Sequence, residues 1–233
     1  MVSFTFDDFP RSALTVAGDL LAEHGLRGTY YAAMGLMGHQ TSVGEICDAA
    51  DLRNLIEAGH ELGCHTFGHL SCHRMATSQW QQDCERNRRV VADLLGGQRL
   101  RNFSFPYGDV TLTAKASLLA SYDSCRTVKA GINRNPVDLG FLRATSMYST
   151  RPLQELQRLL ADNIEQAGWL ILYTHDVDSQ PSAYGCTPAY FREVLTCAIA
   201  SGASIVTVAE AVNRFRPRQD RSPAGELAGR ATS

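Results

Sequence analysis

Apolar residues along this chain follow two patterns, short continuous runs and longer stretches that repeat every three or four positions. The continuous run at 169–173 is typical of a strand buried on both faces of a parallel sheet. Strands are also predicted at 28–32, 141–144 and 204–207. Stretches at 12–24, 48–58 and 78–95 place their apolar residues on one helical stripe and are followed by glycine. Such strands and helices alternate about seven times with short connections, which predicts one α/β domain.

A parallel sheet built this way is expected to close, or nearly close, into a barrel with right-handed crossovers. An open doubly wound sheet is the alternative, but no glycine-rich phosphate loop follows the first strand. We predict that the domain spans residues 1–215. In residues 216–233 the composition turns to Arg, Pro, Gly and Ser, which is typical of a loosely packed tail.

Composition excludes several classes of partner. The 233 residues carry a formal net charge of -2 with no block of like charges, so neither nucleic acid nor an anionic membrane surface is predicted. No apolar run approaches the ~20 residues of a membrane span, and no basic-then-apolar leader is present. The seven cysteines lack CxxC spacing and are expected to be reduced core thiols. We therefore expect a cytoplasmic protein, of undetermined oligomeric state.

Two adjacent carboxylates, Asp7 and Asp8, end the first predicted strand. Neighbouring carboxylates resist burial unless they are paired or bound to metal. Successive side chains of an extended chain point to opposite sides, so one acid can bind a cation while the other stays free as a base. The alternative is a helix cap, in which Asp8 or Ser12 satisfies free backbone amides. The choice depends on whether metal ligands occur elsewhere.

Two histidines, His65 and His69, follow another predicted strand. If these histidines lie on a helical turn, their four-residue spacing places both on one face, where they can bind the same metal ion. Asp8 would be the third ligand of a two-histidine, one-carboxylate site that leaves coordination positions open for water. The spacing also fits two ordinary histidines. The alternative is a closed structural zinc site, whose four ligands would come from Cys64, His65, His69, Cys72 and His73. That site is disfavoured, because Cys64 neighbours His65 on a strand and should point away from it.

His175 follows the long apolar run and precedes Asp176. Imidazole titrates near neutrality and an adjacent carboxylate would keep it protonated longer, which suits a general acid. A structural histidine is the alternative. Pro106 and Tyr107 follow a further predicted strand. In a parallel barrel all these residues lie at the C-terminal face, where the active sites of barrels occur.

Together these segments resemble the ordered motifs of the polysaccharide deacetylases, carbohydrate esterase family 4, also called the NodB homology domain. The matching segments are Thr5-Phe-Asp-Asp8, His65-Thr-Phe-Gly-His69, Phe103-Ser-Phe-Pro-Tyr-Gly108 and Leu172-Tyr-Thr-His175. Four motifs in this order are far more specific than any one alone, and the resemblance spans about residues 2–212. It implies a single-domain, distorted (β/α)7 barrel and metal-dependent removal of acetyl groups from sugars, most often from N-acetylglucosamine units.

Carried over residue by residue, the resemblance makes Asp7 the general base and His175 the general acid. The implied metal ligands are Asp8, His65 and His69. The backbone N–H of Tyr107 would help to hold the oxyanion, and Pro106 with Tyr107 would form one wall of the groove. The implied cofactor is a divalent metal, zinc first and cobalt or nickel as alternatives, and the implied partner is a carbohydrate substrate.

Two features depart from the family's pattern. Many members carry an arginine two residues before the proline of the third motif, where it steadies the catalytic aspartate, and here that position is Ser104. We predict Arg143 as the substitute partner of Asp7. The family's acidic-then-tryptophan segment is not evident, so Asp176 is the candidate that orients His175.

The leading function is therefore carbohydrate N-deacetylation. An O-acetyl esterase or a hydrolase of small cyclic amides would use the same centre, and the ligands alone also fit an iron oxygenase. A catalytically silent sugar-binding module is the alternative from another class, disfavoured because base, ligands and acid are all present. We assign to the core, rather than to sugar stacking, the aromatic residues Tyr30, Tyr31, Trp80 and Trp169.

Overall fold

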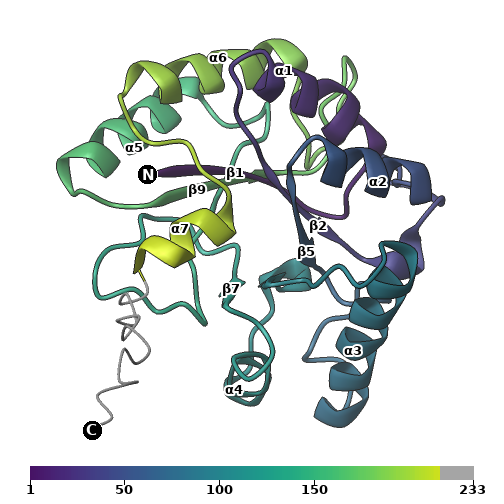
Figure 1. Ribbon diagram of the computed structural model, residues 1–233. Coiled ribbons are helices and arrows are strands. Elements are labelled where there is room, and N and C mark those ends of the chain that lie inside the picture. Colours follow the sequence, from purple (N-terminus) through teal and green to yellow (C-terminus); the bar gives the residue numbers. More distant parts are fainter. Residues whose placement is uncertain (216–233) are drawn as a thin grey trace, which may run out of the picture.

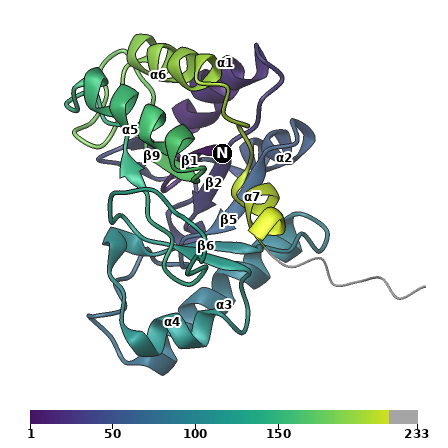
Figure 2. The same ribbon diagram turned by 90° about the vertical axis from the view of Figure 1, so that its left-hand side faces the viewer.

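The computed structural model describes residues 1–215, and the predicted tail lies outside the described residues. Seven parallel strands form one curled sheet in the order β7-β6-β5-β2-β1-β9-β8, with helices around its outside (Figures 1 and 2). The strands are β1 Val2–Phe6, β2 Thr29–Ala32, β5 Glu61–Cys64, β6 Asn102–Ser104, β7 Ser124–Arg126, β8 Thr145–Ser146 and β9 Leu170–Thr174. A two-stranded hairpin outside the sheet is formed by β3 Gln40–Thr41 and β4 Gly44–Glu45. The predicted distorted (β/α)7 barrel is confirmed.

The segment before β8 brings the two edges of the sheet together. Leu142 pairs with β7, because its N–H donates to the Cys125 carbonyl and its carbonyl accepts from the Thr127 N–H, each at 2.9 Å. From Thr145 onward the same segment pairs with β9. The observed strand β8, Thr145–Ser146, therefore begins later in the chain than the strand predicted at 141–144. Of the predicted residues, Leu142 forms only an isolated bridge to Arg126 at the end of β7.

Helices cover the outer face of the sheet, with α5 and α6 packed together on one side and α3 and α4 on the other (Figure 1). The helices are α1 Asp19–Ala22, α2 Ala49–Glu57, α3 Thr77–Leu94, α4 Leu112–Leu118, α5 Leu153–Glu165, α6 Pro188–Ala200 and α7 Val208–Phe215. Some of these helices have side-chain N-caps: Asp48 forms a capping box with Asp51 at the start of α2, and Thr187 caps α6. No helix within residues 1–215 is long and apolar enough to cross a membrane.

Two predicted elements differ from the observed ones. The helix expected at 12–24 begins as a π-helical stretch, Ala13–Gly18, before α1. The strand expected at 204–207 is a single bridge between Ile205 and Val2, after which the chain turns into α7. The bridge stays short because β2 takes over as the neighbour of β1 from Thr5 onward.

The first strand, β1, lies inside the sheet between β2 and β9, and all five of its residues are buried. Its phenylalanines Phe4 and Phe6 are wholly inaccessible, and burying each contributes about 1.5–3 kcal/mol to folding. The strand ends at the C-terminal rim of the barrel. It therefore delivers the next two residues, Asp7 and Asp8, to the middle of that rim.

A candidate metal centre beside a buried ion pair

The three predicted ligands converge at the rim although they come from two distant parts of the chain. Asp8 Oδ1 lies 3.2 Å from His69 Nε2 and 3.5 Å from His65 Nε2. One ligand atom from each residue lies within 4.8 Å of the other two. Within residues 1–215 this is the only group of three or more histidine, cysteine or acidic residues gathered so closely.

The donor atoms fit a divalent cation. His65 Nδ1 is 2.7 Å from the Ser104 carbonyl, so Nδ1 carries the proton and the lone pair of Nε2 faces Asp8. His69 Nδ1 lies 3.2 Å from the Tyr107 hydroxyl, which leaves His69 Nε2 to face Asp8. Asp8 Oδ1 is buried and makes no hydrogen bond to the described residues, although a buried carboxylate oxygen without a partner is costly. Zinc, cobalt or nickel would satisfy that oxygen.

The titration of these groups also suits metal binding. Burial raises the pKa of Asp8 to about 6, opposed by the charge of His175 and assisted by that of Asp7. Burial lowers the pKa of His65 to about 3 and that of His69 below its ordinary value. Both imidazoles are therefore neutral near pH 7, which is the form that ligates metal. A bound cation would in turn favour the ionised form of Asp8.

The two histidines meet through a loop rather than the predicted helical turn. Thr66 and His69 have positive φ angles of 61° and 52°, so the chain turns back twice within five residues. Asp83 of α3 holds this loop, because its Oδ2 accepts the N–H groups of Phe67 and Gly68 at 2.8 and 3.0 Å. Two N–H donors on one carboxylate oxygen make a strong anchor. The expected helical spacing was wrong, but the convergence that it predicted is present.

Backbone conformations of high energy gather at this rim. Among residues 1–215, six non-glycine residues have positive φ, and five of them follow the strands that carry the site: Asp8, Phe9, Thr66, His69 and Tyr107. Each such residue costs roughly 1–2 kcal/mol. Clustering of this kind is typical of functional sites, where the surrounding structure enforces conformations that side-chain positioning requires.

Asp7 has a partner of its own inside the barrel. Its carboxylate accepts a hydrogen bond from the guanidinium of Arg126, a fully buried residue of β7. The Arg126 guanidinium also lies about 5 Å from the ring centroids of Tyr31 and Tyr173, at 5.1 and 5.0 Å. Burial opposes ionisation of Asp7, but the charge and hydrogen bond of Arg126, together with the charges of His65 and His175, outweigh it and hold the pKa of Asp7 below its usual value. Asp7 therefore stays ionised, as a general base must.

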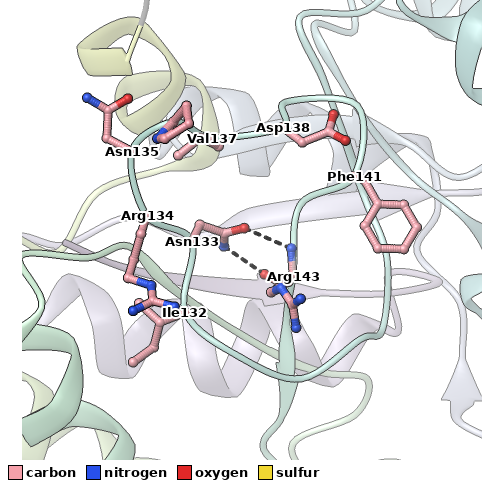
Figure 3. Close-up of a pocket in the computed structure, with 9 residues that line it drawn as sticks. Ile132, Asn133, Arg134, Asn135, Val137, Asp138, Phe141 and Arg143 are labelled. Atoms are coloured by element: carbon pink, nitrogen blue, oxygen red, sulfur yellow. Dashed lines mark hydrogen bonds between the residues drawn. The ribbon is translucent and has the colours of Figure 1, made fainter.

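Arg143, the predicted partner of Asp7, lies elsewhere, and that prediction was wrong. Its backbone N–H and carbonyl pair with the side-chain amide of Asn133, both at 2.9 Å (Figure 3). Its guanidinium donates to the Ala130 carbonyl at 3.2 Å and lines an outer hollow. Strand alternation explains the error: Arg143 points outward, whereas Arg126 points into the barrel. An arginine at the end of a short strand was the sequence signal for Arg126.

His175 lies on the other side of Asp8 from the two ligand histidines, with its Nε2 4.0 Å from Asp8 Oδ2. Its Nδ1 faces the carbonyl of Tyr184 at 3.2 Å, so Asp176 is not its direct partner. The Asp176 carboxylate instead accepts the N–H and hydroxyl of Ser182, at 2.7 and 2.6 Å. A backbone carbonyl thus orients the imidazole, and Asp176 fixes the turn that carries this carbonyl.

The closed structural zinc site is not formed. Cys64 Sγ is buried and accepts a hydrogen bond from Asn87 Nδ2 at 3.2 Å. Cys72 Sγ donates to the carbonyl of Asp109 at 3.2 Å. Both thiols are therefore engaged away from the two ligand histidines, as the strand alternation at Cys64 predicted.

Comparison with known sequences agrees with this geometry. The sequence model of the family described as "Polysaccharide deacetylase" matches residues 1–122, more than half of the chain. The matched part includes Asp7, Asp8, the two ligand histidines and Tyr107. The chain therefore belongs to the polysaccharide deacetylase family.

Individual relatives are distant. The chain is 26% identical over 121 residues to a chitin deacetylase of Arthroderma benhamiae, a match that covers 50% of this chain and 31% of that protein. The structure resembles the chitin deacetylase of the fungal pathogen Colletotrichum lindemuthianum, with a TM-score of 0.66, 16% identity and coverage of 90% and 85% of the two chains. It also resembles a family 4 acetyl xylan esterase from Clostridium thermocellum in complex with a cobalt ion, with a TM-score of 0.62, 19% identity and coverage of 91% and 90%.

Proposed function

We propose that this protein is a divalent-metal-dependent hydrolase that removes acetyl groups from a carbohydrate, with N-acetylglucosamine units as the first-choice substrate. One observation carries the proposal: of two adjacent aspartates, Asp7 is ionised by Arg126, while Asp8 presents a buried, unpartnered oxygen to two imidazoles. One acid is thereby suited to accept a proton and the other to bind a cation. Membership of the polysaccharide deacetylase family supports the substrate class.

The proposed mechanism assigns a task to each group. A divalent cation bound by the three ligands would lower the pKa of a water molecule and polarise the acetyl carbonyl. Asp7 accepts the proton of that water as its oxygen adds to the carbonyl carbon. We assign the backbone N–H of Tyr107 to the developing oxyanion, beside the groove wall at Pro106. The carbon–nitrogen bond then breaks, His175 delivers a proton to the nitrogen, and acetate and a free amine leave. An amine is a poor leaving group, which makes this acid necessary.

Acetate release measured on chelator-stripped and reloaded protein tests the proposal. We expect release from N-acetylglucosamine oligomers only after zinc, cobalt or nickel is returned, and a rate about 10²–10⁴-fold lower from Asp7→Asn. Arg143→Ala is the matched control, because it removes a charged side chain outside the site and should keep full activity. Acetate release that is insensitive to the chelator, or equal in Asp7→Asn and wild type, would overturn the proposal.

O-acetyl ester hydrolysis is the second candidate, supported by the structural likeness to an acetyl xylan esterase. An alkoxide leaves more readily than an amine, so an esterase depends less on its general acid. His175→Ala should therefore lose more activity on N-acetylglucosamine oligomers than on acetylated xylan or nitrophenyl acetate. Turnover of xylan or of a small cyclic amide in preference to the oligomers would reassign the substrate. Sugar binding without hydrolysis under any of the three metals would indicate a silent module.

A further inference from the structure

Aromatic side chains of the described residues are almost all buried or half-buried, with two exceptions. Tyr107 is 63% exposed and Tyr184 is 53% exposed. Both stand beside histidines of the candidate site: the ring centroids of Tyr107 and His69 are 4.6 Å apart, and those of Tyr184 and His175 are 5.7 Å apart. Burial of a large aromatic ring lowers the free energy of the folded protein, so exposed rings are unfavourable unless they bind something. Because the two most exposed rings lie at the same rim, we interpret this rim as a binding surface.

The two rings flank the centre on opposite sides. In the sheet, β6 precedes Tyr107 and β5 precedes His69, and both strands lie on one side of β1 (Figure 2). The strand that precedes His175 and Tyr184, β9, is the neighbour of β1 on its other side. Asp8, which follows β1, therefore lies between the two aromatic rings.

Tyr184 is held on a turn that is fixed from several directions. Its carbonyl accepts the backbone N–H of His175 at 3.1 Å, and its N–H donates to Ser182 Oγ at 3.1 Å. Ser182 in turn donates two hydrogen bonds, from its N–H and its hydroxyl, to the carboxylate of Asp176. The next residue must be glycine, because a Cβ at Gly185 would lie 2.4 Å from Asp176 Oδ1. The backbone that carries the ring is thus rigid, while the ring itself projects into solvent.

A neighbouring aromatic residue also supports the ring. Tyr148 meets the Tyr184 ring edge to face, with centroids 6.0 Å apart and planes at 80°. This arrangement is favourable for aromatic pairs and braces one side of the ring. The exposed face of Tyr184 therefore has a defined orientation before any ligand arrives, which lowers the entropy cost of binding.

We propose that Tyr184 is a substrate-binding residue whose ring stacks on a sugar unit adjacent to the one that is deacetylated, across the centre from Tyr107. This inference rests on the proposed carbohydrate substrate. One face of a pyranose ring presents C–H groups and suits an aromatic face, while the phenol hydroxyl can bond to the sugar's hydroxyls. The ligand class is an oligosaccharide of at least two units, because the stacked unit is the neighbour of the one that is deacetylated.

Kinetics of Tyr184→Ala test this role. We expect KM for N-acetylglucosamine oligomers to rise roughly 2- to 12-fold. The effect on hydrolysis of nitrophenyl acetate should be much smaller, because that substrate has no second sugar unit to stack on the ring. Tyr184→Phe and Tyr184→Trp keep an aromatic face and should restore most of the affinity. Asp176→Asn is the contrasting variant: it loosens the whole turn and should lower kcat on both substrates. A Tyr184→Ala protein that behaves like Asp176→Asn would show a structural role and overturn the inference.

Binding measured without turnover separates this inference from the proposed hydrolysis. Calorimetry with N-acetylglucosamine oligomers on Asp7→Asn should give a Kd that rises by the same factor when Tyr184→Ala is added. Unchanged Kd and KM in active protein would end the role of Tyr184 and leave the hydrolase intact. Tyr184-dependent binding by a wild-type protein that hydrolyses nothing would support this inference and end the hydrolase. Absence of oligosaccharide binding altogether would overturn the role of Tyr184.

Discussion

Asp7 and Asp8 are adjacent in the sequence but lie in opposite electrostatic environments. The inner pair, Asp7 with Arg126, is complete: a buried carboxylate meets a buried guanidinium, and the pKa of Asp7 falls below its ordinary value. The rim cluster, Asp8 with His65 and His69, is incomplete: a buried carboxylate meets two neutral imidazoles, and burial raises the pKa of Asp8 to about 6.

The difference shows how one strand end can serve two tasks. A carboxylate whose counter-charge is supplied by the chain remains an anion whether or not a ligand is present, so it can act as a base. A carboxylate whose counter-charge is missing is harder to ionise, and an external cation stabilises its anionic form. Neighbours in sequence thus differ because their side chains enter different surroundings.

Asp8→Asn should abolish metal binding, because the amide supplies no negative charge to the rim cluster. We expect the metal content of dialysed protein to fall to the background of chelator-treated wild type, and hydrolysis with it. Metal analysis by mass spectrometry and acetate release measure the two losses. The same metal content in Asp8→Asn as in wild type would mean that the rim cluster is not the metal site.

Asp7→Asn should leave the metal in place while lowering kcat about 10²–10⁴-fold, the range that a general base contributes. The amide keeps the shape of the side chain but cannot accept the water's proton. Metal content and kcat are measured on the same preparation. Loss of the metal along with activity would contradict the division of tasks between Asp7 and Asp8.

Arg126→Met should lower the free energy of unfolding by about 3–5 kcal/mol, because it leaves the Asp7 carboxylate buried without a counter-charge. Denaturant unfolding of the metal-free protein measures this. Adding Asp7→Asn to Arg126→Met removes the buried charge and should recover part of the loss, whereas two independent effects would add. Arg143→Met is the control, with an expected change within about 0.5 kcal/mol, because Arg143 is exposed.

Asp83→Asn should weaken metal affinity about 10- to 100-fold without removing any ligand, as loss of groups that orient ligands typically does. The variant replaces the anionic acceptor of the Phe67 and Gly68 N–H groups, so the loop between the two ligand histidines loosens. Competition with a metal-binding dye measures affinity. An unchanged affinity would show that the loop is held well enough by its other contacts.

Metal affinity should depend on pH through Asp8. The pKa of Asp8 is raised to about 6, so below pH 6 the metal must displace a proton from its carboxyl group. The pKa values of both histidines are lowered by burial, which reduces the number of protons that the imidazoles contribute. Affinity should then fall about 10-fold per pH unit as the pH drops, and stay level above pH 7. Calorimetry in buffers of different ionisation enthalpy should show about one proton released at pH 5 and almost none at pH 8. Release of two or more protons would mean that the imidazoles are charged.

Much of the site could be predicted because its chemistry is tied to strand ends. The adjacent acids, the histidine pair and His175 each follow an apolar run, and the C-terminal ends of parallel strands meet at one rim. Arg126 and Tyr184 could not be chosen in the same way. Choosing Arg126 over Arg143 requires knowing which face of each strand points inward, and a one-residue shift reverses that choice. Tyr184 lies in a turn whose position depends on Asp176 and Ser182.

The alternation of strands and helices, and the residue types at the ends of the strands, follow from local patterns in the sequence. Such patterns suffice because periodicity and glycine stops reflect short-range constraints. The charges that meet are known only from the folded structure: Arg126 neutralises Asp7, Asp8 Oδ1 has no hydrogen-bond partner among the described residues, and a backbone carbonyl orients His175. Electrostatic partners depend on distances across the barrel between residues far apart in the chain, and no local pattern encodes those distances.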